Sequence, residues 1–207
     1  QLKEAGFDAR QLKEVGFDGF RLKEAGFSVQ ELSTAYSRNL EQLKEFGFGA
    51  SQLREAGFRA RELKLAGFGA KQLKDAGFDA RELREAGFGT GQLRDAGFDL
   101  RRLSVAGCGA HQLREVGFDA RDLNGVGFDV QKLREAGYDI RQLRDAGFGA
   151  ESLRKAGIGV HELIAVGCDL KQLRDAGFDA GSLKEAGFDA SQLKDVGFDH
   201  GQLTDAG

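Results

Sequence analysis

The chain of 207 residues contains no proline, methionine or tryptophan, only two cysteines and no long apolar run. Two cysteines cannot form a disulfide framework, so the composition favours an intracellular chain over a disulfide-rich secreted one. No apolar run approaches the ~18 residues of a membrane-spanning helix, so no such helix is expected. A chain without methionine lacks its initiator residue, and we therefore expect a processed chain or a fragment.

A strong excess of charge is also lacking. Lysine and arginine number 30, aspartate and glutamate number 33, and the formal net charge at pH 7 is -3. Proteins that bind nucleic acid usually show a strong basic excess. The expected partners are therefore proteins or further repeats of the same chain, and nucleic acid is not expected.

What the sequence has in abundance is one ten-residue unit, which is repeated along the whole chain. Leucine recurs every ten residues, except that Leu32 and Leu43 are eleven apart. With leucine at position 3, the unit reads variable, Gln/Glu, Leu, Lys/Arg, Glu/Asp, Ala/Val, Gly, Phe, Asp/Gly, Ala/Val. The eleven-residue step places a one-residue register break in residues 36–42. No segment resembles a linker, so residues 1–207 are expected to form a single repeat array.

Each position of the unit is explained if the unit is a two-turn α-helix of about seven or eight residues. Asp79 is expected to cap the first turn of its helix, and Glu82 completes a capping box. Leu83 lies with the flanking alanines on one apolar stripe, whereas Arg84 and its acidic neighbour are expected to face water. Gly87 stands where a helix ends in a left-handed residue.

The phenylalanine at position 8 joins one helix to the next. Phe78 follows the glycine that ends one helix and precedes the cap of the following helix, so it can contact the leucines of both. Such helices are marginal alone, because isolated helices need ~12–15 residues. Stability must come from stacking, and the predicted fold is an all-α solenoid or superhelix of about twenty two-turn helices.

A β-solenoid of the pentapeptide type is the rival fold. Leucine and phenylalanine alternate every five residues, as the inward side chains of such a coil would. That coil also needs a small residue two places before each inward residue. Ala76 before Phe78 fits this rule, but Arg81 before Leu83 does not. The helix-forming core Gln-Leu-Lys-Glu-Ala also favours helices over strands.

Residues 183–188, with the sequence Leu-Lys-Glu-Ala-Gly-Phe, resemble the LKEAGF-type decapeptide repeats of uncharacterised protist, viral and bacterial proteins. The resemblance extends over nearly the whole chain. It implies a short-helix solenoid, and it carries no known activity, cofactor or functional residue.

The sequence contains no catalytic cluster, so the protein is not expected to be an enzyme or to need a cofactor. Its carboxylates are evenly spread, whereas a catalytic acid pair needs one member in a special environment. Cys108 with His111, and His161 with Cys168, could together ligate zinc. These two pairs lie about fifty residues apart, and both cysteines replace the linking phenylalanine, so packing is the favoured interpretation and no metal site is predicted.

Departures from the repeat are the candidate functional positions. Position 5 is usually acidic, and four of the five exceptions from Leu43 onward are separated by multiples of twenty residues: Leu65, Val105, Gly125 and Ala165. Alternate units therefore face different surroundings, and this row is expected to be less exposed. Ile164 extends its apolar character, so Leu65, Val105 and Ile164 are candidate partner contacts. Packing inside the coil is an equally good explanation.

The register break supplies a second group of candidates. Tyr36 interrupts the glycine pattern, Leu40 is extra, and Phe46 replaces a small residue. Phe20 is another aromatic residue outside the pattern. Because aromatic side chains are enriched at interfaces, all four are candidate partner contacts, although a repaired insertion would give the same sequence.

These features predict a structural scaffold or a solenoid for protein–protein interaction, as part of a larger assembly. The alternative is a module that grips a peptide or polymer along a groove with the variable position 1, occupied for example by Arg61, His111 and Glu151. Simple solvent exposure also explains that variability. Open solenoid ends expose apolar surface, so we expect further repeats or other subunits to cover them.

Overall fold

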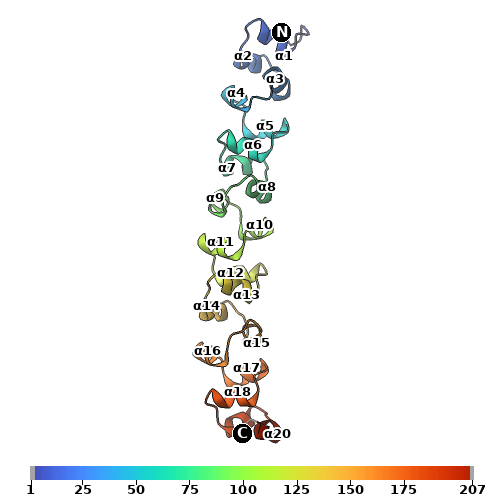
Figure 1. Cartoon of the computed structure of the whole chain (residues 1–207). Coiled ribbons are helices and arrows are strands. Elements are labelled where there is room, and N and C mark those ends of the chain that lie inside the picture. Colours follow the sequence, from blue (N-terminus) through green and yellow to red (C-terminus); the bar gives the residue numbers. More distant parts are fainter. Residues whose placement is uncertain (1–2, 206–207) are drawn as a thin grey trace. The chain divides into compact units, whose positions relative to one another are not determined.

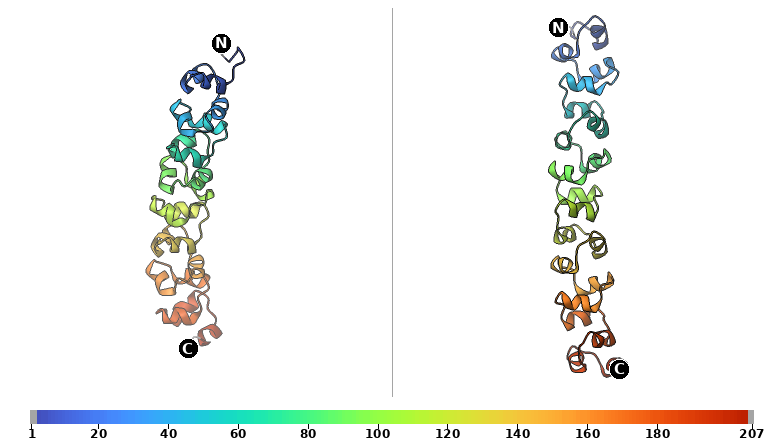
Figure 2. Two further views of the ribbon diagram at one scale, coloured as in Figure 1. Left: turned by 45° about the horizontal axis from the view of Figure 1, so that its top comes forward. Right: turned by 60° about the vertical axis from the view of Figure 1, so that its left-hand side comes forward.

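The computed structural model describes residues 3–205. Contacts divide the chain into two compact units, unit 1 from Gln1 to Cys108 and unit 2 from Gly109 to Gly207. All regular structure among the described residues is helical, and no strand is found there. The same succession of short helices and tight turns is seen from three directions (Figures 1 and 2). The predicted all-α solenoid is confirmed, and the β-solenoid alternative is wrong.

The described part of unit 1 contains α1 (Ala9–Glu14), α2 (Gly19–Glu24), α3 (Val29–Ala35), α4 (Leu40–Glu45), α5 (Ala50–Glu55), α6 (Ala60–Leu65), α7 (Ala70–Asp75), α8 (Ala80–Glu85), α9 (Thr90–Asp95) and α10 (Leu100–Val105). The described part of unit 2 contains α11 (Ala110–Glu115), α12 (Ala120–Gly125), α13 (Val130–Glu135), α14 (Ile140–Asp145), α15 (Ala150–Lys155), α16 (Val160–Ala165), α17 (Leu170–Asp175), α18 (Ala180–Glu185), α19 (Ala190–Asp195) and α20 (His200–Asp205).

Helix α8 shows how the unit starts and stops a helix. Asp79 Oδ1 accepts a hydrogen bond from the Glu82 N–H at 2.8 Å, and Glu82 Oε2 accepts one from the Asp79 N–H at 2.8 Å. At the other end, the Gly87 N–H donates to the Arg84 carbonyl at 2.8 Å, and the next amide donates to the Leu83 carbonyl at 3.0 Å. Gly87 has a φ of 91°, so this is the predicted left-handed ending.

The helices are shorter than the predicted seven or eight residues. Helix α8 has six residues, as do the other described helices except α3, which has seven. Ala86 at position 6 already serves as the C-cap, with a ψ of -7°. Its side chain nevertheless stays on the apolar stripe, because Ala80, Leu83 and Ala86 are all buried.

Alternate helices stack on each other, with two helices in each turn of the solenoid. In unit 1, α6 contacts α8 and α8 contacts α10, while α5, α7 and α9 form the other stack. Figure 1 shows α8 and α10 on one side and α9 on the other. The same pairing joins α12 to α14 and α15 to α17 in unit 2. The leucines at position 3 lie between the stacks, and Leu83 is fully buried.

The register break lies at the end of α3, which carries the extra residue. Tyr36 is the C-cap of this helix, and the Arg38 N–H donates to the Ser33 carbonyl at 2.6 Å. Ser37 and Arg38 have φ values of 51° and 55°, so two consecutive left-handed residues close this helix where other units use one glycine. Asn39 then caps α4 by accepting from the Gln42 N–H at 3.1 Å.

Three aromatic residues fill the space around this break. The Phe46 ring lies 4.8 Å from the Tyr36 ring and 5.5 Å from the Phe20 ring, measured between centroids, and both pairs meet edge to face. Gly19 leaves room for Phe46, because a Cβ atom at Gly19 would lie 2.2 Å from the ring. Phe46 is a large residue at position 6, where other units have alanine or valine. The glycine at position 10 of another unit, Gly19, provides the space for it.

We predict that Gly19→Ala and Phe46→Ala each destabilise unit 1 and partly compensate for each other. The first change overfills the site and lowers the free energy of unfolding by about 1–3 kcal/mol. The second leaves a cavity and costs about 3–5 kcal/mol. The double variant restores the repeat pattern. Its loss of stability should therefore be smaller than the sum of the losses of the two single variants. Urea unfolding followed by circular dichroism measures all three, and strictly additive losses would contradict the proposed fit.

Candidate functional site

A cation at position 4 of one helix reaches the C-terminal end of the helix two places further along. Lys64 Nζ, on α6, donates to the Gly87 carbonyl at 2.6 Å, just beyond the end of α8. The same ammonium lies 4.9 Å from the centroid of the Phe88 ring. The carbonyls at a helix C-terminus carry partial negative charge, and the face of an aromatic ring also attracts cations. We call this contact the cross-turn clamp.

The cross-turn clamp recurs in both units. Hydrogen bonds from position 4 to the C-terminal end of the second helix along are made by Lys3, Lys13, Lys23, Lys44, Arg54, Lys64, Lys74 and Arg84 in unit 1, and by Arg114, Arg134, Arg144 and Arg154 in unit 2. Position 4 is expected to face water, and Arg84 does so, but the clamp is an additional role that the sequence did not predict. Arg84 is exposed, yet it donates to the Ala106 carbonyl at 3.2 Å.

Two of the units without a cation at position 4 show substitutes for the clamp. Ser33 is buried and has no long side chain, but the guanidinium of Arg38, from the register break, lies 4.4 Å from the centroid of the Phe58 ring. Asn124 keeps the hydrogen bond without the charge, because its Nδ2 donates to the Ala146 carbonyl at 2.9 Å.

Both cysteines lie in the place of the linking phenylalanine and are buried, as the packing interpretation predicted. Arg144 Nη1 lies 2.7 Å from Cys168 Sγ, where other clamps contact a ring. Burial raises the pKa of the Cys168 thiol, against the opposing effect of Arg144. Among residues 3–205, no group of three or more His, Cys, Asp and Glu side chains could hold a metal ion.

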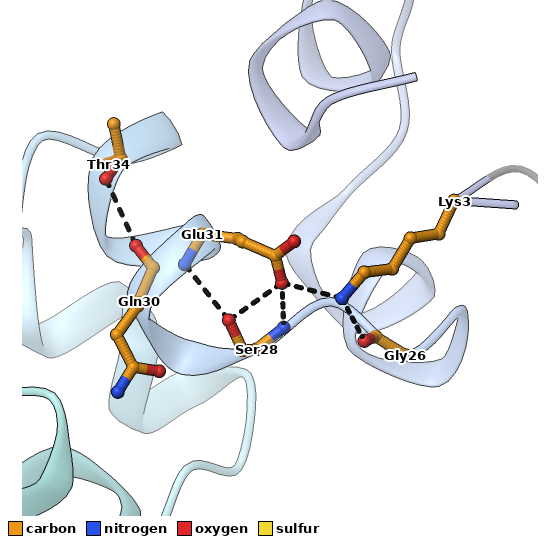
Figure 3. A network of polar contacts seen from close by, with 6 residues as sticks. All are labelled: Lys3, Gly26, Ser28, Gln30, Glu31 and Thr34. Atoms are coloured by element: carbon orange, nitrogen blue, oxygen red, sulfur yellow. Dashed lines mark hydrogen bonds and ion pairs between the residues drawn. The ribbon is translucent and has the colours of Figure 1, made fainter. Parts of the chain in front are cut away.

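The first clamp also binds a carboxylate (Figure 3). Lys3 Nζ donates to the Gly26 carbonyl at 3.0 Å and to Glu31 Oε2 at 2.8 Å. The same oxygen of Glu31 accepts from the Ser28 N–H and from its hydroxyl, both at 2.7 Å. The hydrogen bond from Lys3 and those from Ser28 lower the pKa of Glu31 to about 2.

We predict that Glu31 titrates well below the ordinary range of glutamate. Its pKa is lowered on folding, so it stabilises unit 1 above about pH 4.5, and this contribution is lost as the pH falls toward 2. Carboxyl chemical shifts measured by NMR during an acid titration give the pKa directly. Lys3→Met should move it upward, and an unchanged value in this variant would show that Lys3 does not set it.

We also predict that Lys74→Met destabilises unit 1 by about 1–2 kcal/mol, because Lys74 binds helix-terminal carbonyls and a ring. Its Nζ donates to the Ala96 and Gly97 carbonyls at 2.9 and 2.7 Å and lies 5.2 Å from the Phe98 ring centroid. Lys71→Met, at the exposed position 1 of the same helix, is the matched control and should change stability by less than about 0.5 kcal/mol. Urea unfolding compares them, and equal losses would mean that the clamp contributes nothing.

A groove lies between successive turns, and the clamp forms part of its wall. In the α6–α8 groove, the lining runs from Arg54 through residues 57–61 to Phe78, Glu82 and residues 85–86. The α8–α10 groove is lined by residues twenty places further along. Unit 2 contains the corresponding α14–α16 and α15–α17 grooves. The groove is therefore a property of the repeat.

The variable position 1 lines these grooves. Arg61 contributes to the α6–α8 groove, Arg81 and Arg101 to the α8–α10 groove, Arg141 to the α14–α16 groove and Glu151 to the α15–α17 groove. Some of these side chains also bridge turns. Arg81 Nη2, for example, donates to the Val105 carbonyl at 3.1 Å. These five side chains at position 1 are therefore arranged along the grooves and are not scattered.

The candidate contacts at the register break are mostly internal. Tyr36 and Phe46 are only 8% exposed and Leu40 is half-buried, which favours the repaired-insertion interpretation for this segment. Phe20 covers the edge of the cluster and remains 54% exposed.

The candidates at position 5 point to solvent. Leu65 is 81% exposed and Val105 is 67% exposed, so the expectation of a less exposed row is wrong, and packing inside the coil does not explain these two residues. They do lie on one stack, as their spacing predicted, because α6, α8 and α10 contact in succession. Ile164, which lies in α16 at position 4 of its repeat unit, is half-buried.

The repeated capped helix, glycine ending and stacking define an all-helical repeat protein of the short-helix solenoid class. The decapeptide repeat region family matches residues 37–110, 100–167 and 147–207. These matches span most of the sequence, and the chain belongs to the decapeptide repeat family, which confirms the resemblance seen in the sequence. No curated protein matches the chain. None of the short helices within residues 3–205 could cross a membrane.

Proposed function

We propose that this protein is a structural scaffold that other proteins contact along its repeats, and that it is not an enzyme. The observation that carries the proposal is the cross-turn clamp. The same charged contact joins α6 to α8 through Lys64 and α7 to α9 through Lys74, so these successive turns are fixed to each other in the same way. A stack built from one repeated bond suits a spacer or brace.

The exposed apolar residues of one stack supply the contact surface for this scaffold. Leu65 and Val105 replace acids at position 5, and both are exposed on the α6–α8–α10 stack. Exposed aliphatic side chains in a row of charged ones favour a protein contact. Phe20, also exposed, offers a further contact near the beginning of unit 1.

A photo-crosslinking amino acid at Leu65 or Val105, in cells that make the protein, tests this proposal. Both sites should crosslink to the same partner protein. Asp75, at position 5 of α7 on the other stack, is the matched control and should give a much weaker product. If the chain purifies as a monomer and all three sites give no product, the scaffold proposal is wrong.

A groove-type binding module is the second candidate. It is supported by the position of the most variable side chains, which line the grooves between turns, as Arg61 and Glu151 do. Repeat proteins that bind extended ligands present such variable side chains from each repeat. The two candidates are compatible, because a scaffold can hold its partners by segments bound in these grooves.

A further inference from the structure

The α8–α10 groove differs in charge from the groove that precedes it by twenty residues. The α6–α8 groove is lined by three arginines and by Glu82 and Glu85. In the α8–α10 groove, Arg102 stands in the place of Glu82 and Val105 in the place of Glu85, so neither of these carboxylates has a counterpart. Four cations then face a single carboxylate, that of Asp79. The groove volume is about 770 Å³, against about 500 Å³ for the α6–α8 groove.

The cations of the α8–α10 groove are only weakly neutralised within the chain. Arg102 Nε lies 3.7 Å from Asp99 Oδ2, and both side chains are 63% exposed, so this ion pair is weak. Arg81 donates to a backbone carbonyl, that of Val105. Among the described residues, Arg101 has no hydrogen-bond or ion-pair partner. Guanidinium groups in this situation are available to carboxylates, which they bind in a bidentate manner.

The groove also has an apolar part. Phe78, Phe98 and Val105 belong to its lining, and Val105 is largely exposed. A ligand that fits both parts needs negative charges for the arginines and an apolar group for Val105.

We propose that the α8–α10 groove binds an acidic peptide segment of a partner protein, with carboxylates on Arg101 and Arg102 and an apolar side chain on Val105. This inference rests on the interaction function proposed above and assigns the chemistry of one partner. A peptide suits this groove better than nucleic acid does. The site is short and partly apolar, and the net charge of -3 gives no long-range attraction for a polyanion.

Fluorescence anisotropy with the full chain tests the proposal. The probe is a short fluorescein-labelled peptide in which glutamate alternates with leucine, and the control peptide carries lysine in place of glutamate. The acidic peptide should bind with an affinity that falls as salt is raised, whereas the lysine peptide should not bind. If the acidic peptide does not bind, or if both peptides bind equally, the proposal is overturned.

Matched variants locate the site. Arg102→Glu combined with Val105→Glu copies the α6–α8 groove into the α8–α10 groove, and binding should weaken by at least about tenfold. Arg101→Gln leaves the helix cap untouched and should weaken binding in the same direction. Circular dichroism shows whether each variant folds. Folded variants that keep the wild-type affinity would refute the assignment.

The reverse exchange gives a gain of function. Glu82→Arg combined with Glu85→Val should create a second site in the α6–α8 groove and raise the stoichiometry from one peptide to two. Glu82 also caps α8, so circular dichroism must first show that this variant folds. A folded variant whose stoichiometry stays at one would show that these positions do not define the site.

Two further outcomes separate this inference from the scaffold function. If a single-stranded RNA oligonucleotide competes with the peptide and shows the same sensitivity to Arg101→Gln, the groove binds polyanions and the peptide proposal falls. If crosslinking at Leu65 identifies a partner whose binding is unaffected by Arg101→Gln and by the paired change at Arg102 and Val105, the scaffold function stands and the groove assignment fails.

Discussion

The contact between a position-4 cation and the end of the second helix along is the interaction on which this structure depends. A six-residue helix leaves most of its backbone groups without a partner inside the helix. Asp79 and Glu82 satisfy amides at the start of α8, and the turn at Gly87 satisfies carbonyls at its end. The carbonyl of Gly87 itself still projects from the helix end, and Lys64 binds it. The cross-turn clamp thus supplies a hydrogen bond that the helix cannot make, and in doing so it joins one turn to the next.

This dependence explains how the register break is tolerated. The extra residue in α3 lengthens by one place only those contacts that span the break, and the unit that carries it has Ser33 in place of a position-4 cation. Arg38 occupies the place of the linking phenylalanine in a left-handed conformation, and its guanidinium covers the Phe58 ring. Tyr36 in turn receives Lys13, whose Nζ lies 4.3 Å from the ring centroid. The insertion therefore changes which residues make the contacts and keeps the contacts themselves.

The features that sequence could predict are those that act within one unit. The Asp79 cap, the buried Leu83 and the left-handed Gly87 depend on neighbours fewer than ten residues away, so the repeat pattern contains them. The clamp joins residues that are 22 to 24 apart in the sequence. It can therefore be predicted only when the number of helices per turn is known. One signal was present, because lysine or arginine fills position 4 in 16 of 21 units, more regularly than solvent exposure requires. The fit of Phe46 against Gly19 spans 27 residues and was hidden for the same reason.

The clamp also determines where the chain can vary. Positions 4 and 8 are committed to holding turns together, and position 3 is buried, which leaves positions 1, 2 and 5 to differ between units. Those positions line the grooves. The α8–α10 groove departs from its neighbour at Arg102 and Val105, while Lys74 and Arg84 still clamp the helices that follow them. Because the buried leucines and the clamp hold most turns together, the charge of a groove can change from turn to turn while the solenoid that presents it stays the same.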